Sequence, residues 1–132
     1  MILKFRAYLK ERPYLKGTGI IVDVQEINYK YEEIVYESGK YKEVADFKDV
    51  ELLQSTGLKD KNGVEIYEGD IVVFNGESDE KYIVCTFLSC FGIRFNDVGF
   101  AAFSAMFDGP ISTEDAFTII GNIFENPNLL EE

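Results

Sequence analysis

The segment from Thr56 to Val72 constrains the fold of this chain more than any other. It joins three turn signals to the start of an apolar strand. In Asp60-Lys61-Asn62-Gly63, asparagine tolerates a positive φ and glycine adopts one without steric cost, which predicts a tight turn. Glu68-Gly69-Asp70 predicts a second turn, directly before the β-branched strand Ile71–Phe74. A Gly-Asp pair that opens such a strand is common at the start of small SH3-like and related barrels, so the segment indicates a β-rich fold.

Alternation of apolar and polar residues predicts strands along most of the remaining chain. Ile27 breaks this alternation, which predicts a bend or bulge near Glu26. Tyr82–Leu88 is apolar on both faces and must be covered on both. The predicted strands, each short and bounded by turn residues, are Leu3–Tyr8, Ile20–Gln25, Ile34–Glu37, Tyr41–Val44, Val50–Gln54, Ile71–Phe74, Tyr82–Leu88, Gly92–Phe95 and Phe117–Phe124.

A few segments carry mixed signals. Asp46–Leu53 fits a short helix as well as a strand, and residues 100–107 combine helical spacing of phenylalanines with strand-like alternation, so both interpretations stay open. Gly121 interrupts the last strand and indicates a bulge. Asn126 and Pro127 predict the N-cap and first position of a final helical turn.

These elements predict a mainly β protein of short antiparallel strands with little helix. Residues 1–54 would form an N-terminal β subdomain and residues 55–132 an SH3-like, barrel-like β subdomain, together making a single structural unit. We expect fewer than about a fifth of the residues in α-helix, against about a third in an average globular protein. Ile71–Phe74, Tyr82–Leu88 and Phe117–Phe124 should share one sheet or barrel.

The charge of the chain argues against direct binding to a nucleic-acid backbone. It has 24 acidic and 13 basic residues, a formal net charge of −11, and the basic residues are scattered. This charge favours solubility, and it also suits an acidic inhibitor that imitates nucleic acid. No apolar signal region follows the start of the chain and no apolar run approaches about 20 residues, so we expect a cytoplasmic protein without a membrane segment.

Several kinds of active site are disfavoured by composition. Histidine is absent, which removes the commonest general base and the commonest metal ligand. Two cysteines without histidine cannot complete a structural zinc site, and the spacing of Cys85 and Cys90 is not that of a Cys-x-x-Cys redox motif. We therefore expect both to be buried, small apolar residues whose thiols lie well apart from one another. We therefore expect no metal, no cofactor and no enzymatic activity.

Four carboxylates gather in the sequence around the two predicted turns: Asp60, Glu65, Glu68 and Asp70. One interpretation is a metal or general acid–base site. The spacing does not fit an EF-hand, because the sixth position counted from Asp60 is Glu65 and not glycine. The favoured interpretation is that Asp60 and Asp70 order turns while the glutamates are solvated.

Tyrosines are frequent between residues 29 and 41, among acidic residues. Tyr29, Tyr31, Tyr36 and Tyr41 could form a surface for a protein partner, since tyrosine is enriched at interfaces. The alternative is that they are strand residues chosen for cross-strand packing.

Three blocks of the chain, Lys4–Tyr8, Thr56–Val72 and Ile120–Pro127, resemble the YopX family, small proteins of phages and prophages of Gram-positive bacteria with no characterised activity. Tyr8 stands where the family often has tryptophan. The matching residues are of turn and core type, so the resemblance implies a shared fold rather than a shared reaction. They are Thr56, Gly57, Asp60, Asn62, Gly63, Tyr67, Gly69, Asp70, Gly121, Asn122, Asn126 and Pro127.

The leading hypothesis is a non-enzymatic protein-interaction or oligomeric module of phage or prophage origin, with an unidentified protein partner. Self-association is expected because the two apolar faces of Tyr82–Leu88 need cover. The alternatives are an acidic inhibitor or nucleic-acid mimic directed at a host DNA-binding protein, and an enzyme that uses the carboxylates from Glu65 to Asp70.

Overall fold

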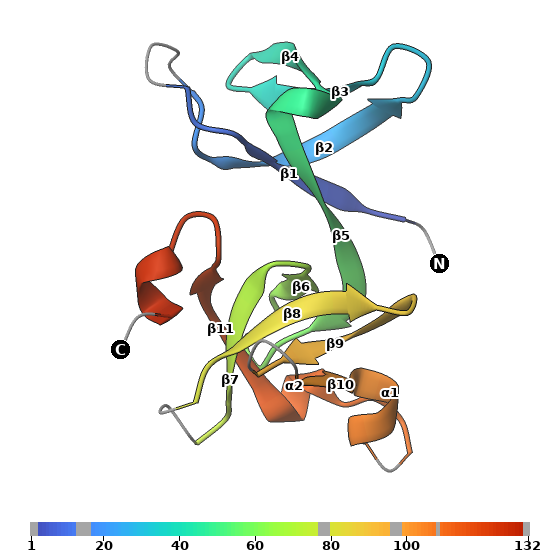
Figure 1. The fold of residues 1–132 in the computed structure, drawn as a ribbon, viewed down its shortest axis with the longest axis vertical. Helices are drawn as coiled ribbons and strands as arrows, with labels where there is room; N and C mark the ends of the chain where they lie inside the picture. Colours follow the sequence, from blue (N-terminus) through green and yellow to red (C-terminus); the bar gives the residue numbers. More distant parts are fainter. Residues whose placement is uncertain (1–2, 13–16, 77–79, 96–98, 108, 131–132) are drawn as a thin grey trace. The chain divides into compact units, whose positions relative to one another are not determined.

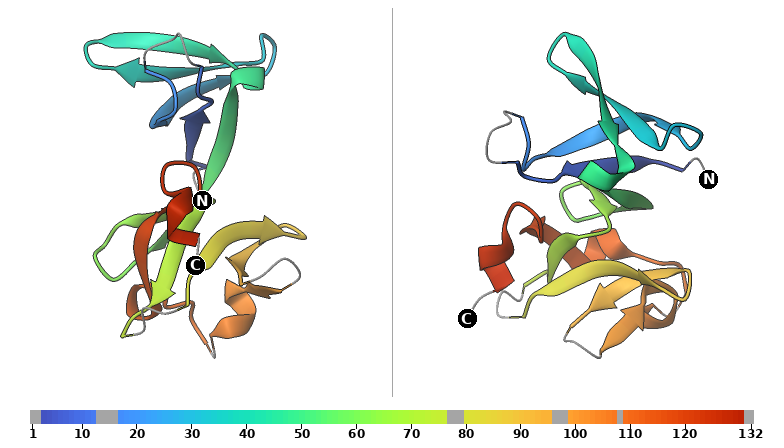
Figure 2. Two further views of the ribbon diagram at one scale, coloured as in Figure 1. Left: turned by 60° about the vertical axis from the view of Figure 1, so that its left-hand side comes forward. Right: turned by 45° about the horizontal axis from the view of Figure 1, so that its top comes forward.

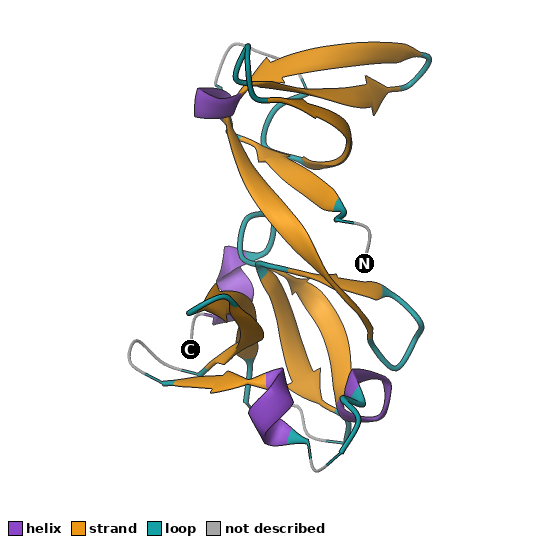
Figure 3. Ribbon diagram, turned by 90° about the vertical axis from the view of Figure 1, so that its right-hand side faces the viewer, coloured by secondary structure: helices purple, strands orange, loops and turns teal. Residues whose placement is uncertain are grey.

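The structure is a computed structural model that describes residues 3–12, 17–76, 80–95, 99–107 and 109–130. Strands dominate it, and the helices are limited to short turns (Figure 3). The α-helices α1 (Phe103–Met106) and α2 (Thr113–Ala116) have four residues each, so the prediction of a mainly β protein with little helix is confirmed. The chain divides into two compact units, unit 1 (Met1–Gln54) and unit 2 (Ser55–Glu132), and each is described by itself.

The strands form two antiparallel sheets (Figure 1). In chain order the strands are β1 (Phe5–Leu9), β2 (Ile21–Asn28), β3 (Glu33–Ser38), β4 (Tyr41–Asp46), β5 (Val50–Lys59), β6 (Glu65–Tyr67), β7 (Asp70–Phe74), β8 (Tyr82–Phe87), β9 (Cys90–Arg94), β10 (Phe100–Ala102) and β11 (Phe117–Asn122). The six-stranded sheet has the order β4-β3-β2-β1-β5-β6, and the five-stranded sheet has the order β10-β9-β8-β7-β11.

Unit 1 is built on β1, which pairs with β2 on one side and with the first half of β5 on the other. Its core consists of four buried side chains, Ala7, Leu9, Ile34 and Val50. The pairing of β2 with β3 shifts register between Val24 and Glu26, which confirms the bulge predicted from the break in alternation.

β5 is longer than the predicted strand Val50–Gln54, because it continues through Thr56-Gly57 to Lys59. Gly57 has a φ of +76°, and the pairing with β6 shifts register between Ser55 and Lys59, so the two residues form a bulge inside the strand. Before the strand, Phe47–Asp49 forms a 3-10 turn (η1). The sequence allowed a short helix or a strand over Asp46–Leu53. Each is correct for a part of it, because the helical turn Phe47–Asp49 is followed by the strand that begins at Val50.

The core of unit 2 lies under the five-stranded sheet and is formed by Ile66, Val72, Val84, Ile93, Phe103 and Phe117. β7, β8 and β11 are neighbours in this sheet, as predicted from their sequences. The register of β11 against β7 shifts between Ile119 and Gly121, which confirms the predicted bulge.

The predicted barrel is not found in unit 2. The sheet ends at β10 and β11, and a closed barrel requires its end strands to pair with each other. No such pairing exists among the described residues. β10 has only three residues before the chain turns into α1, so it offers little edge for closure. The segment 100–107 thus contains a strand and then a helix, which explains why its sequence shows both periods.

The prediction for residues 82–88 needs a correction at its end. β8 stops at Phe87, and Leu88 and Ser89 form the turn to β9 with φ values of +51° and +64°. Leu88 is 81% exposed. Because the pair Phe87–Cys90 closes a two-residue hairpin there, Leu88 belongs to the turn and does not extend an apolar strand face.

Valine substitutions at Gly69 and Gly63 separate the cost of the backbone conformation from the cost of a steric clash. Both have a positive φ, +88° and +77°. A Cβ at Gly69 would lie 3.0 Å from Cε2 of Phe124, whereas a Cβ at Gly63 would meet nothing within 4 Å. Gly63→Val should therefore lower the free energy of unfolding by about 1–2 kcal/mol, the conformational cost alone. Gly69→Val should cost about 1 kcal/mol more because the phenylalanine must move. Urea unfolding of both variants measures the difference, and the reverse order would contradict the turn assignment.

Candidate functional site

Asp60 makes several hydrogen bonds that connect separate parts of unit 2. It lies at the end of β5, where the Asp60–Gly63 turn closes with a hydrogen bond from Gly63 N to Asp60 O (3.0 Å). One carboxylate oxygen accepts hydrogen bonds from the backbone N–H groups of Asn62 and Val64, each at 2.9 Å. The other oxygen accepts from Ile119 N at 2.9 Å. Asp60 is 1% exposed, so the carboxylate joins its own turn to β11 inside the protein.

The second turn is built in a similar way. Asp70 is buried, and its Oδ2 accepts a hydrogen bond from Tyr67 N at 2.8 Å across the Glu68-Gly69 loop. Gly69 N donates to Val84 O at 2.8 Å, and Gly69 O accepts from Ile123 N at 2.9 Å. The turn is therefore held by β8 on one side and by the end of β11 on the other.

Asn122 closes this arrangement at the end of β11. Its side-chain oxygen accepts from the backbone N–H groups of Phe124 and Glu125 at 3.0 and 2.8 Å. The side-chain oxygen of Asn126 accepts from Asn122 N at 3.1 Å, so it is directed back to the strand and does not cap the 3-10 turn η2 (Pro127–Leu130) that follows. Asn126 still directly precedes the turn, as predicted, and its backbone carbonyl accepts a hydrogen bond from Leu129 N at 3.1 Å.

The four carboxylates do not converge on one pocket. Glu65 accepts a hydrogen bond from the Ser55 hydroxyl, and Glu68 accepts one from the Thr86 hydroxyl at 3.0 Å. Asp60 and Asp70 bind backbone N–H groups, as the turn interpretation expected. Within the described part of the chain, no group of three or more His, Cys, Asp or Glu side chains is placed to hold a metal ion.

The β8–β9 hairpin tip is a feature that the sequence did not reveal. We use the name hairpin tip for Phe87, Leu88, Ser89 and Cys90. Phe87 is 56% exposed, and its ring lies 5.4 Å from the ring of Phe100. Leucine and serine are not typical residues of a tight turn, which favours Asn-Gly and similar pairs, so the sequence carried no signal for it. The hairpin tip presents an apolar surface on a short, well-defined turn.

An apolar hollow of about 500 Å³ lies toward the other end of the same hairpin. Aromatic rings form much of its wall: Tyr82 meets Phe74 edge-on at 5.3 Å between ring centroids, and Phe95 at 6.5 Å. Glu80 is the charged residue among those that line it, together with Phe74, Tyr82, Ile93, Phe95, Ala101 and Met106. Its volume lies within the range of small-molecule sites, but it lacks the convergent polar groups that usually orient a ligand.

The model of one protein family, described as YopX protein, matches residues 4–131 of the chain. The chain belongs to the YopX family. The match includes both units and all three sequence blocks on which the resemblance was based.

A solved structure supports the same assignment. This YopX protein is similar to the crystal structure of protein EF1440 from Enterococcus faecalis, with 29% sequence identity over 99% of each chain and a TM-score of 0.62. No curated protein gives a significant match. In this YopX protein, most of the residues on which the family resemblance was based occupy turn and core positions that connect β5, β7, β8 and β11.

The four tyrosines of the predicted partner surface are divided between two places. Tyr29 and Tyr31 lie in the turn between β2 and β3, where Tyr29 packs edge-on against Phe47 and Lys30 lies over the ring of Tyr31. Tyr41 begins β4 at the other end of β3, about 20 Å away by the length of a six-residue strand. Tyr36 is half-buried within β3, and burial, followed by the negative charge of Glu43, raises its pKa.

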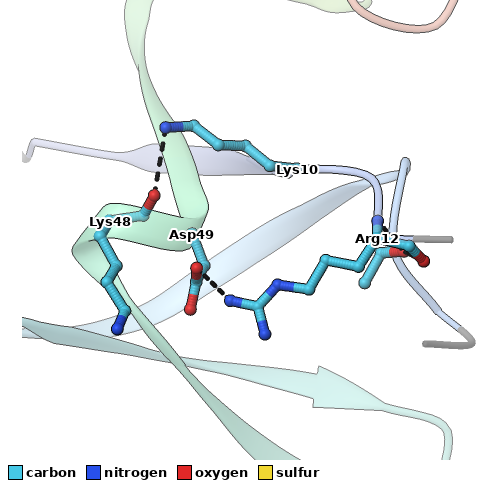
Figure 4. Close-up of polar contacts among 5 residues, drawn as sticks. Lys10, Arg12, Lys48 and Asp49 are labelled. Atoms are coloured by element: carbon cyan, nitrogen blue, oxygen red, sulfur yellow. Dashed lines mark hydrogen bonds and ion pairs between the residues drawn. The ribbon is translucent and has the colours of Figure 1, made fainter. Parts of the chain in front are cut away.

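A small hollow of about 180 Å³ in unit 1 has a polar side (Figure 4). Lys10 Nζ donates to the Lys48 carbonyl at 3.1 Å, and the Arg12 guanidinium forms an ion pair with Asp49. Lys10 also lies 3.8 Å from a carboxylate oxygen of Glu51. Both cations that line the hollow are therefore neutralised by neighbours in the same unit, which makes it a poor site for an anion.

The two cysteines lie on one face of the β8–β9 hairpin. Cys85 pairs with Gly92 and Phe87 pairs with Cys90, so the two cysteines are diagonal neighbours, with Cα atoms about 7–8 Å apart in an antiparallel ladder. This corrects the expectation that they are well apart, but the separation is still too long for a disulfide without backbone movement. Cys90 is exposed and Cys85 is half-buried, so the expectation of two buried thiols is wrong for Cys90 and met only in part for Cys85. Burial raises the pKa of Cys85, while Arg94 opposes and Glu68 reinforces this shift.

The negative charge of the chain is concentrated in unit 2. Residues 55–132 include 14 acidic and four basic residues, whereas residues 1–54 include ten acidic and nine basic residues. Almost all of the net charge of −11 therefore belongs to the sequence of unit 2. None of the helices in the described ranges has the length and hydropathy of a membrane span.

Proposed function

We propose that this YopX protein is a non-enzymatic protein-interaction module of a phage or prophage. It would act in the host cytoplasm by placing the hairpin tip in an apolar pocket of a protein partner. The observation that carries the proposal is Leu88, which is 81% exposed on a turn where its φ is +51°.

The turn chemistry supports a binding role for this leucine. A side chain other than glycine or asparagine costs about 1–2 kcal/mol in the left-handed region. An exposed leucine recovers none of that cost by burial within the chain. Asparagine or glycine would serve the turn better, so a leucine here is better suited to contact with another molecule than to stability.

The contact of Phe87 and the net charge of unit 2 both support binding to a basic partner. Phe87 extends the apolar surface, and its contact with Phe100 restricts the ring, which reduces the entropy lost on binding. The acidic excess of unit 2 would steer a basic partner toward it and speed association at low salt.

Leu88→Asn tests the proposal because it removes the apolar anchor and suits the turn. We expect its melting temperature to equal or exceed that of the parent, since asparagine tolerates a positive φ. We expect the partners captured from a host lysate by the tagged parent protein, quantified by mass spectrometry, to fall at least about tenfold, the loss of one good anchor.

The matched control is Val64→Ser, which removes another exposed apolar side chain of unit 2, at the Asp60–Gly63 turn. Its captured proteins should equal those of the parent. Capture that is undiminished by Leu88→Asn would contradict a role for the hairpin tip.

The charge of unit 2 favours a second candidate, an acidic inhibitor or nucleic-acid mimic of a host DNA-binding protein. The supporting observation is its 14 acidic against four basic residues. Such a protein should release DNA from its target, and the effect should weaken steeply between 50 and 200 mM salt because it depends on charge. Proteins captured equally by the parent and by Leu88→Asn, and eluted by salt, would favour this candidate over the first.

A further inference from the structure

The edges of the two sheets are unequally protected. An exposed edge strand has unpaired backbone groups that can form hydrogen bonds with another chain. Proteins prevent such pairing with short edge strands, bulges or proline. β6 and β10 have three residues each, and β11 contains the bulge at Gly121. β4 has six residues, pairs with β3 without a register shift and contains no proline. Among the described strands, β4 is therefore the edge best suited to pair with another strand (Figures 1 and 2).

The register of the β3–β4 hairpin shows which backbone groups of β4 face the open edge. A two-residue loop separates the paired residues Ser38 and Tyr41. In such a hairpin the pair next to the loop exchanges both backbone hydrogen bonds, and the pattern then alternates along the ladder. The hydrogen bond from Phe47 N to Glu32 O at 2.8 Å continues this alternation beyond the strand. The odd-numbered residues of β4 therefore direct their backbone groups toward β3.

The even-numbered residues Lys42, Val44 and Asp46 consequently direct their N–H and C=O groups away from β3. Their side chains also share one face of the strand. All three residues are exposed, Val44 to 54%. In this row the apolar Val44 lies between the cation Lys42 and the anion Asp46. When two copies of the strand pair antiparallel, the cation of each copy can therefore lie opposite the anion of the other.

We infer that β4 pairs with β4 of a second copy of the chain, antiparallel about a two-fold axis at Val44. In this register Val44 lies opposite Val44 of the second copy, and Lys42 lies opposite Asp46 of the second copy, twice by symmetry. Each of these pairs exchanges both backbone hydrogen bonds, and cross-strand pairs of opposite charge are favourable. The interface is isologous, as in most homodimers.

Charge disfavours two of the neighbouring registers of the same symmetry, and a shorter overlap disfavours a third. An axis at Glu43 would place Glu43 opposite its own copy, and an axis at Lys42 would do the same with Lys42. Like charges directly opposite each other are destabilising. An axis at Ala45 would place Val44 opposite Asp46 and shorten the overlap. The register at Val44 is thus the one in which every charged side chain of the row meets its opposite.

The location of β4 reduces the electrostatic cost of association. It belongs to unit 1, whose ten acidic and nine basic residues nearly balance, and not to the acidic unit 2. Exposed charges farther apart than about 8 Å are largely screened at physiological salt. Because a single strand pair buries little surface, we expect a weak dimer that forms at concentrations on the order of 10–100 µM. This surface is separate from the hairpin tip, so the inference does not depend on the proposed function.

Sedimentation equilibrium of the full chain over a concentration series tests the pairing. The parent should rise from the chain mass of 15.0 kDa toward twice that mass. Lys42→Asp and Asp46→Lys each place like charges opposite one another and should weaken the dimer at least tenfold. The double variant Lys42→Asp/Asp46→Lys restores opposite charges and should recover dimerisation. Val44→Pro removes an N–H that faces the edge, so it should abolish the dimer while circular dichroism stays that of the parent.

Other results would overturn the inference. A parent protein that stays monomeric throughout the series would show that β4 is not self-complementary. A dimer unaffected by the single charge variants and by Val44→Pro would lie on another surface. A dimer lost with Leu88→Asn would place the contact at the hairpin tip, whereas the inference expects that variant to associate like the parent. Failure of the double variant to recover would exclude the register at Val44.

Discussion

Replacing Asp60 with alanine should lower the free energy of unfolding by about 3–5 kcal/mol, the largest effect we expect from any single carboxylate. Three backbone N–H groups, those of Asn62, Val64 and Ile119, lose their acceptor. A buried donor left without a partner costs about 1–3 kcal/mol, and the cost is smaller where water can replace the acceptor, as at the exposed residues Asn62 and Val64. The full sum is not expected because water can enter the enlarged site, and values above about 4–5 kcal/mol are exceptional for one substitution. Urea unfolding followed by circular dichroism measures the loss.

Two further variants separate hydrogen bonding from burial at this position. Asp60→Asn keeps one oxygen for Asn62 and Val64 but turns an amide N–H toward Ile119 N, so it should cost about half as much as the alanine variant. Glu114→Ala, an exposed carboxylate of the same unit, should change stability by less than about 0.5 kcal/mol. If Asp60→Ala fell within 1 kcal/mol of the parent, Asp60 would not be the link between its turn and β11.

Replacing Gly92 with alanine should cost about 2–4 kcal/mol, although only one methyl group is added. A Cβ at this position would lie 2.2 Å from Ala101 O and 2.8 Å from Ala102 Cα. Both are backbone atoms of β10, which pairs with β9 at this point, so the methyl group cannot be accommodated by rotation of a side chain. The two strands must separate, and overpacking of this kind typically costs 1–3 kcal/mol or more.

Hydrogen exchange locates the effect of Gly92→Ala. Amides in β10 should lose protection, while the pairing of β7 with β11 should stay protected. Gly39→Ala is the matched control, because that glycine has a positive φ of +63° and no heavy atom within 4 Å of the added Cβ. It should cost about 1 kcal/mol through conformation alone. Equal losses for the two variants would mean that β9 and β10 do not approach as closely as described.

Local patterns accounted for a large part of the fold. The break in alternation at Ile27 and the glycine at position 121 correctly located two bulges, and Gly63 and Gly69 have the positive φ that their turns require. The mixed pattern of residues 100–107 was also informative, since a strand and a helix follow each other there. Each of these features depends on a few consecutive residues and on the stereochemistry of one backbone segment.

Other features lay outside local reasoning. The strand β6 was missed because its three residues are too few to show a period. Leu88 was assigned to a strand because its hydrophobicity continued the apolar run, whereas its place in a turn follows from the pairing of Phe87 with Cys90. Whether the four tyrosines share a surface also lay beyond local reasoning, because the length of β3 separates Tyr29 and Tyr31 from Tyr41.

The sequence by itself determined the secondary structure class, two of the turn conformations and the family, because these depend on side-chain alternation, on the φ range of glycine and on residues read in order. Only the tertiary structure decided that the sheet of unit 2 ends at β10 and β11 without closing, that Asp60 binds Ile119, and that Gly92 must lack a side chain. The physical reason is distance along the chain. Asp60 and Ile119 are 59 residues apart, and no local preference of either residue records which strand the other will meet.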